Sequence, residues 1–502
     1  MQETLVIQSV LDNLASCPLL LPEILIAVTI GVILVLTGLL PRYQRYWLLP
    51  VALLGTIGAW YSTYRLGSYL VIRSTRPLFN QLLTLDPLAV FFCLLLLSIT
   101  LFLLFVPPQQ TRLSLNTTHK PIYVVLILVI LLGSCLLVMA FHWLTIYLSL
   151  TLLSLASALL IGSHQTPHSI EGSLKYLLYS MATTAVMLWG MAHFYGFTGT
   201  LALGDPNLKF ILQTVPEYIV LATLGLCISG LLATIAAVPY HFWVPDVYQG
   251  APSAVVSCLS TMPRLATVAV FLRLFQQLLP QLEAMLQMKM QHGMATLALL
   301  TLIVGHTAAL VQNNGQRLFA YGSVAQGGLL MAGIAASKSN PIAVWYYSAV
   351  YGIMGLAAWV GIKILQRLTG SRHLQEYAGL GRKFPLLGSS ITLTVFALIG
   401  LPPTAGFTGK LLIFTALWDH VQRTGSFVFG ALLMASLLGT IFSLYYYLKL
   451  PYLLFCKAAR QPMAALRVQP ADQIVLGCLA TLLLVGFFAA SSLLGALGNW
   501  CD

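Results

Sequence analysis

Charged residues are scarce in this sequence. Only 8% of its 502 residues are Asp, Glu, Lys or Arg, while 59% are hydrophobic and the mean hydropathy is +0.88. No soluble globular protein has this composition. Acidic residues are the rarest, with 13 Asp and Glu against 25 Lys and Arg. The formal net charge of +12 lies in short loops, where membrane topology explains it better than a nucleic-acid partner does.

Motifs for metals and nucleotides are also lacking. The eight cysteines form no CxxC pair, and most of them fall inside apolar runs: Cys93, Cys135, Cys227, Cys258 and Cys478. This spacing argues against a zinc or iron–sulfur site and favours small packing residues. No GxGxxG follows a strand, and no stretch is long enough for a soluble domain. The sequence therefore predicts that this chain binds no nucleotide, flavin or metal by itself.

What is present is a series of apolar runs of about 20 residues, the length of a helix that crosses a membrane. They predict an all-α polytopic membrane protein with about 14 transmembrane helices. The expected spans are 19–40, 47–66, 84–106, 121–140, 142–162, 174–196, 217–239, 251–279, 294–311, 318–336, 341–365, 386–418, 427–449 and 474–494.

Basic residues are distributed unevenly over the loops between these spans, and an even number of spans puts both termini on one side. Most loop cations fall on the other side: Arg42, Arg45, Arg112, Lys120, Lys175, Arg317, Lys363, Arg367, Arg372, Arg382, Lys383, Lys449, Lys457, Arg460 and Arg467. By the positive-inside rule, we expect both termini on the outer face.

Two spans are interrupted by proline. Pro402 and Pro403 lie within Ile399–Lys410, in the middle of the twelfth span, and Pro239 lies at the end of the seventh. Proline cannot donate a helical hydrogen bond, so each interruption should leave backbone groups free at membrane depth. Corresponding breaks predict two inverted five-helix repeats, spans 4–8 (121–279) and spans 9–13 (294–449). Residues 1–120 then form three N-terminal helices and 450–502 a last one; two unrelated kinks are the alternative.

Several polar residues within apolar runs are candidates for a transport path. Lys410 follows the twelfth-span break, His241 follows Pro239, and Arg264, His306 and Gln326 lie inside spans 8, 9 and 10. Intramembrane ionisable groups are costly, which makes them functional candidates. Two alternatives stay open: His306 is either an interhelical hydrogen-bond contact or a proton carrier, and Lys410 either lies in a hydrated pocket or extends to an interface.

Three further charged residues have structural interpretations. We expect Arg273 to extend toward the interface, Asp86 to cap the third span, and Glu23 to lie near the interface at the start of the first span.

The chain resembles the antiporter-like membrane subunits of respiratory complex I and its relatives over essentially its whole length. The most specific stretches are Ser173–Leu178, Ala237–Pro252, Leu318–Gly328 and Gly400–Lys410. The Leu21-Pro22-Glu23 opening and the number of spans favour the shorter members of the family over the one with an added lateral helix.

The resemblance implies a non-redox subunit of a proton-translocating NADH:quinone oxidoreductase in a bacterial inner membrane. Sister antiporter-like subunits, small membrane subunits and lipids would be its partners. NADH, FMN, iron–sulfur clusters and quinone would belong to the whole complex. A cation/proton antiporter subunit and a membrane subunit of an ion-coupled hydrogenase are the alternatives. Co-purification with iron–sulfur and flavin subunits would distinguish them.

The resemblance also indicates an incomplete proton path. Lys410 matches the family's lysine on the broken twelfth helix, while Arg264 stands where the family has a lysine on the eighth. Thr151 and Thr234 stand where the family has a paired glutamate and lysine. Two threonines hold no charge, so we expect a degenerate first half-channel. Losing both partners together leaves no uncompensated buried charge.

Overall fold

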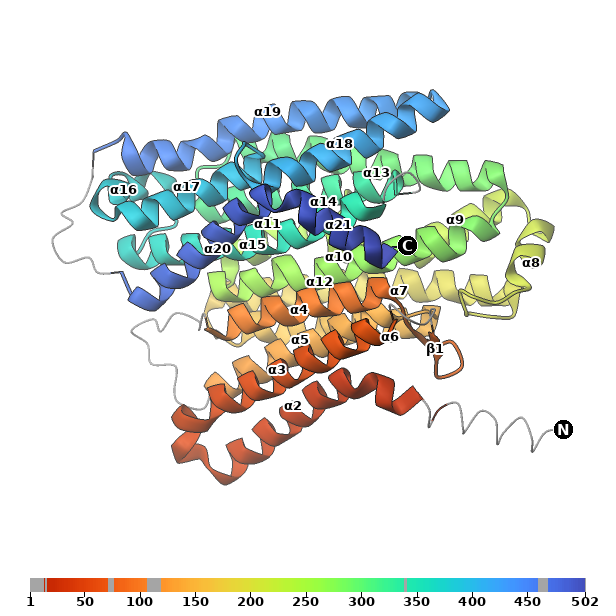
Figure 1. Cartoon of the computed structure of the whole chain (residues 1–502), viewed down its shortest axis with the longest axis horizontal. Coiled ribbons are helices and arrows are strands. Elements are labelled where there is room, and N and C mark those ends of the chain that lie inside the picture. Colours follow the sequence, from red (N-terminus) through yellow and green to blue (C-terminus); the bar gives the residue numbers. More distant parts are fainter. Residues whose placement is uncertain are drawn as a thin grey trace.

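Long helices lie side by side along a common direction (Figure 1). The computed structural model describes residues 13, 16–70, 76–105, 119–337, 341–458 and 468–501. Its α-helices are α2 (Leu21–Leu39), α3 (Gln44–Leu70), α4 (Pro87–Phe105), α5 (His119–Met139), α6 (Trp143–Gly162), α7 (Pro167–Thr198), α8 (Leu208–Thr214), α9 (Glu217–Cys227), α10 (Ser229–Ile235), α11 (Trp243–Gly250), α12 (Ser253–Arg273), α13 (Ala284–Leu310), α14 (Gly315–Ala335), α15 (Pro341–Thr369), α16 (Leu380–Lys383), α17 (Pro385–Ile399), α18 (Ala405–Thr424), α19 (Phe427–Phe455), α20 (Pro470–Phe488) and α21 (Ala490–Cys501).

Short turns and one hairpin complete the described chain. Single 3-10 or π turns cover Cys17–Leu20, Pro41–Tyr43, Leu274–Leu278, Leu279–Gln281 and Leu374–Tyr377. The strands β1 (Arg76–Leu78) and β2 (Leu83–Leu85) pair antiparallel and directly precede α4 in the sequence. The sequence pattern did not predict this hairpin, because three-residue strands are too short for a periodic signal.

The helices confirm a polytopic membrane protein. Within the described residues, ten helices are long and apolar enough to cross a membrane, and the bent pair α9 and α10 makes an eleventh. Every predicted span overlaps one helix or a broken pair of helices. The number of crossings and the inverted repeat stay predictions.

Three helices form the centre of the molecule. The most apolar stretch of α12 is 100% buried, and those of α14 and α15 are 89% buried. Small residues let the surrounding helices approach closely: a Cβ on Gly305 of α13 would lie 2.6 Å from the Ala325 amide nitrogen of α14. Close packing of this kind stabilises helix pairs in lipid. Two of the candidate polar residues, Arg264 on α12 and Gln326 on α14, lie in this buried centre.

Both predicted interruptions are present. Residues 400–404 separate α17 from α18, and α10 ends before Pro239, which precedes α11. The seventh span has a second break that the sequence did not predict, a 44° bend between α9 and α10.

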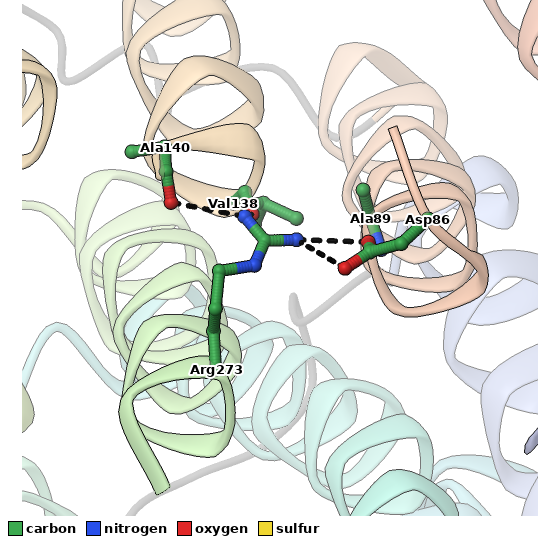
Figure 2. A network of polar contacts seen from close by, with 5 residues as sticks. All are labelled: Asp86, Ala89, Val138, Ala140 and Arg273. Carbon is green, nitrogen blue, oxygen red and sulfur yellow. Dashed lines mark hydrogen bonds and ion pairs between the residues drawn. The ribbon is translucent and has the colours of Figure 1, made fainter. Parts of the chain in front are cut away.

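The outward extension predicted for Arg273 is wrong, because its side chain is buried and bonded within the protein. One Nη2 atom lies 2.8 Å from Oδ1 and 3.0 Å from Oδ2 of Asp86, and Nη1 donates to the carbonyls of Val138 and Ala140 at 2.6 and 3.0 Å (Figure 2). Asp86 is also the predicted cap, since its Oδ1 accepts from the Ala89 amide at 2.7 Å. One carboxylate thus caps α4 and pairs a buried cation.

Other charged residues are more buried than expected. Glu23, in the first turn of α2, is buried within the protein, and its position near an interface stays a prediction. Lys363, counted with the loop cations, is buried in α15 and contacts Asp472 of α20 at 3.1 Å. This buried ion pair connects α20 to α15 of the core. Residues 450–502 contain two helices, α20 and α21, where one was expected. The loop cations Arg112, Arg460 and Arg467 lie outside the described residues.

Candidate functional site

Lys410 lies directly beside the break in the twelfth span. It is in the second turn of α18, 4% exposed, and its Nζ donates to the carbonyls of Leu398 and Ile399, each at 2.8 Å. These are the last carbonyls of α17, which have no helical donor because the chain leaves the helix before Pro402 and Pro403. The negative end of the α17 dipole also favours a cation there. The break therefore binds the ammonium group.

The amide of Gln326 shares one of these carbonyls. Its Nε2 donates to the Leu398 oxygen at 3.0 Å, and its Oε1 accepts from the Tyr347 hydroxyl. Gln326 and Tyr347 are buried on α14 and α15. Lys410 is thus connected to the central helices through one backbone oxygen.

Arg264 is fully buried in α12. Its Nη1 donates to the carbonyl of Ser323 at 2.7 Å and to the hydroxyl of Tyr351 at 3.1 Å, and its guanidinium lies 5.9 Å from the centre of the Tyr248 ring. Tyr351 in turn donates to the Ser260 carbonyl at 2.9 Å. A carbonyl, a hydroxyl and an aromatic face therefore stabilise this cation.

These contacts form two adjacent steps on the same pair of helices. Ser323 and Gln326 are three residues apart on α14, and Tyr347 and Tyr351 are four apart on α15, so each pair occupies one helix face. Ser323 and Tyr351 contact Arg264, and Gln326 and Tyr347 lead to Lys410 through the Leu398 carbonyl. We call these six residues the central polar path: Arg264, Ser323, Tyr351, Tyr347, Gln326 and Lys410.

The tyrosines of this path were missed from the sequence. Tyr347 and Tyr351 belong to an aromatic-rich run, Trp345-Tyr346-Tyr347 followed by Tyr351. Their spacing of four residues, on a helix that is apolar on all sides, could have identified them, because a buried tyrosine hydroxyl needs a hydrogen-bond partner. Which partner they meet depends on how helices pack.

His306 lies beside the path. It is buried in α13, its Nδ1 is 3.2 Å from the Tyr446 hydroxyl of α19, and it is close enough to Lys410 for an electrostatic interaction. The interhelical contact expected of this histidine is therefore present. Its role as a proton carrier stays a prediction.

His241 lies apart from these residues, in the turn between α10 and α11. Its side chain is buried and its ring lies 4.4 Å from that of Phe242, centre to centre. Among the described residues, its Nδ1 has no hydrogen-bond partner.

Thr151 and Thr234 bind their own helices. The Thr151 hydroxyl donates to the Leu148 carbonyl of α6 at 2.8 Å, and the Thr234 hydroxyl donates to the Gly230 carbonyl of α10 at 2.9 Å. Both side chains are partly exposed within the chain. This local bonding is usual for threonine in apolar helices.

Charged groups from both halves of the chain meet around α11. Asp246 accepts from Lys175 of α7 at 3.1 Å and from Arg317 of α14 at 2.7 Å, and Lys175 also lies 2.8 Å from Glu171. Partial burial by itself would raise the pKa of Asp246, but the two cations outweigh it and hold that pKa below its usual range.

A family model described as "NADH:quinone oxidoreductase/Mrp antiporter, TM" matches residues 140–439. NADH-quinone oxidoreductase subunit N of Anaeromyxobacter is 31% identical over 497 residues, 94% of each chain. NAD(P)H-quinone oxidoreductase subunit 2 of Synechococcus elongatus is 34% identical over 69% of this chain and 65% of its own.

Solved structures agree with these sequence matches. A chain of respiratory complex I from Thermus thermophilus superposes with a TM-score of 0.77 at 28% identity, covering 95% of this chain and 99% of its own. A chain of the Mrp complex from Dietzia gives 0.81 at 17% identity, over 95% and 96%. That second likeness shows the fold alone.

Proposed function

The chain belongs to the NADH:quinone oxidoreductase/Mrp antiporter transmembrane family, and we propose that it is a membrane-arm subunit N of a proton-translocating NADH:quinone oxidoreductase. It couples quinone reduction elsewhere in the assembly to proton movement. NADH, FMN, iron–sulfur clusters and quinone belong to other chains, and sister antiporter-like subunits flank this one. The bacterial inner membrane is its location.

The observation that carries the proton role is the environment of Lys410. Burial makes an ammonium group easier to deprotonate because it disfavours charge, whereas here two carbonyls stabilise the charged form, so the two forms are closer in free energy than in an exposed lysine. Gln326 can keep one of those carbonyls bonded when the lysine is neutral. Arg264 stays charged at every relevant pH, so it fixes the local potential and does not exchange protons.

The two halves of the subunit are functionally unequal in this proposal. The second half keeps Lys410, with His306 and Gln326 close by. The first half has Thr151 and Thr234, whose hydroxyls bond their own helices and carry no charge. Threonines can orient water, but they cannot act as the acid and base of an electrostatic switch.

The test uses the purified assembled complex. Lys410→Ala should lower quinone-coupled turnover and the number of protons moved per electron, because it removes the titrating group. Thr151→Ala and Thr234→Ala should leave both unchanged apart from packing effects of about 1 kcal/mol. Full activity in Lys410→Ala would make the subunit a passive spacer. Lost pumping in a normally assembled Thr234→Ala complex would reveal a water-borne path in the first half.

An antiporter subunit and a hydrogenase subunit are the competing assignments, since Mrp and other membrane complexes share the fold. Affinity purification of the full chain separates them. Flavin and iron–sulfur subunits in the purified assembly support the oxidoreductase, whereas an assembly of membrane subunits alone supports an antiporter.

A further inference from the structure

Three ligand-type side chains meet at one end of the N-terminal helices, away from the central polar path. Glu23 is in the first turn of α2, Cys93 in α4 and Cys135 near the end of α5. A carboxylate oxygen and the two Sγ atoms lie within 4.8 Å of one another, and all three side chains are buried. The helices bring together residues that are 70 and 42 positions apart in the sequence.

A small cavity adjoins this group. Its volume is about 10 Å³, and its lining includes Glu23, Cys93, Thr63 and the thioether-bearing Met139. That volume suits a single water molecule or ion.

The Glu23 carboxyl group requires a further hydrogen-bond partner or ligand at this place. Its side chain is 6% exposed, and among the described residues its Oε2 has no hydrogen-bond partner. A buried carboxyl oxygen without a hydrogen-bond partner is destabilising. A ligand between the carboxyl group and the two thiols would meet this requirement.

We propose that Glu23, Cys93 and Cys135 bind one thiophilic d10 cation, with Zn²⁺ as its physiological form. Thiolate sulfur and glutamate oxygen are accepted zinc ligands, with Zn–S of about 2.3 Å and Zn–O of about 2.1 Å. Tetrahedral ligation at those lengths puts ligand atoms about 3.5–3.8 Å apart, so separations of up to 4.8 Å have to shorten by at most about 1.3 Å.

The charges of this site balance. Binding releases one proton from each thiol to the solvent, and the two thiolates neutralise the divalent ion, as a buried site requires. Glu23 supplies the oxygen ligand as a neutral carboxylic acid, through its carbonyl oxygen, so the bound site carries no net charge. The site is independent of proton translocation by Lys410.

The experiment uses the reduced full-length chain in lipid nanodiscs. Titration with Cd²⁺ should give the ultraviolet thiolate-to-metal charge-transfer band at one equivalent per chain, and Zn²⁺ should displace it. Cys93→Ser and Cys135→Ser should each weaken binding by more than the roughly 10–100-fold typical of outer-shell partners. Glu23→Gln should keep the band with weaker binding. Cys227→Ser, which alters a buried cysteine of α9, is the matched control and should bind normally.

Alkylation gives a readout on the unmodified sequence if the serine variants fail to fold. Zn²⁺ should protect Cys93 and Cys135, but not Cys227, from a membrane-permeant thiol reagent, as read by peptide mass spectrometry. The proposal is overturned if the reduced chain gives no charge-transfer band, if both serine variants bind as tightly as the parent, or if Cys93 and Cys135 form a disulfide in the freshly purified chain.

Discussion

Buried cations are stabilised in three different ways in this protein. Arg273 has a carboxylate partner, Lys410 has the free carbonyls of a helix end, and Arg264 has a carbonyl, a hydroxyl and an aromatic ring. The two arginines stay charged at every relevant pH, whereas a lysine can release its proton where burial disfavours the charge. The residue type at each position therefore distinguishes the cation that we propose to exchange protons, Lys410, from two fixed ones.

Among single residues, Asp86 is the one whose loss should be most costly in this pair. Asp86→Ala should lower the free energy of unfolding by roughly 3–5 kcal/mol, because the buried charge of Arg273 would lose its carboxylate partner. Thermal or denaturant unfolding of the purified chain measures the change. The matched control is Glu217→Ala, which breaks the exposed pair with Lys289 and should cost no more than about 1 kcal/mol. Equal losses in both variants would contradict the structural role of the buried pair.

At the level of elements, the short helix α11 depends on its neighbours. Eight residues are too few for a helix that is stable by itself. Asp246 connects it to α7 through Lys175 and to α14 through Arg317. Each ion pair is partly exposed, so by itself it stabilises the fold only weakly. Because both pairs share one carboxylate, together they stabilise it more than a single pair would.

This connection should depend on pH. The pKa of Asp246 is lower in the folded chain than the value of about 3.9 expected when unfolded, so its stabilising contribution is complete above that value and disappears as the pH falls through the folded pKa. Asp246→Asn should therefore lower the melting temperature at pH 7, and the difference from the parent should shrink below about pH 4. Asp419→Asn, at an exposed position of α18, is the control. A difference that does not change with pH would rule out the ion pairs as its cause.

Across the whole molecule, the described chain begins and ends toward the same end of the bundle (Figure 1). At the opposite end lie α16 and the beginnings of α17 and α20, beside several of the loop cations. This arrangement agrees with the even number of spans expected from the sequence. The side of the membrane on which the termini lie stays a prediction from the positive-inside rule.

Labelling of cells tests that orientation. A cysteine introduced by His373→Cys, in the loop 366–383, should resist a membrane-impermeant thiol reagent in intact cells and react after the membrane is opened. Gln422→Cys, near the end of α18, should react in intact cells. Both positions are exposed on the protein surface, so a difference in labelling reports the side of the membrane and not burial of the side chain. Rapid labelling through His373→Cys in intact cells would reverse the topology.

The sequence by itself determined the class of protein, the positions of most helices and the break at Pro402 and Pro403. These features depend on local causes. The length of an apolar run decides whether a helix can cross the membrane, and a proline cannot donate a backbone hydrogen bond whatever surrounds it. It also identified Lys410, Arg264, His306 and Gln326 as polar groups in apolar surroundings.

Only the tertiary structure decided which of these groups meet. Arg273 and Asp86 are 187 residues apart, so no local pattern predicted their pairing, and the tendency of a long side chain to extend outward gave the wrong answer. Tyr347 and Tyr351 entered the central polar path through helix packing alone. Glu23, Cys93 and Cys135 likewise lack a motif spacing, because three separate helices bring them together. Contacts between distant helices depend on the shape of their packed surfaces, and the local hydrophobic pattern does not encode that shape.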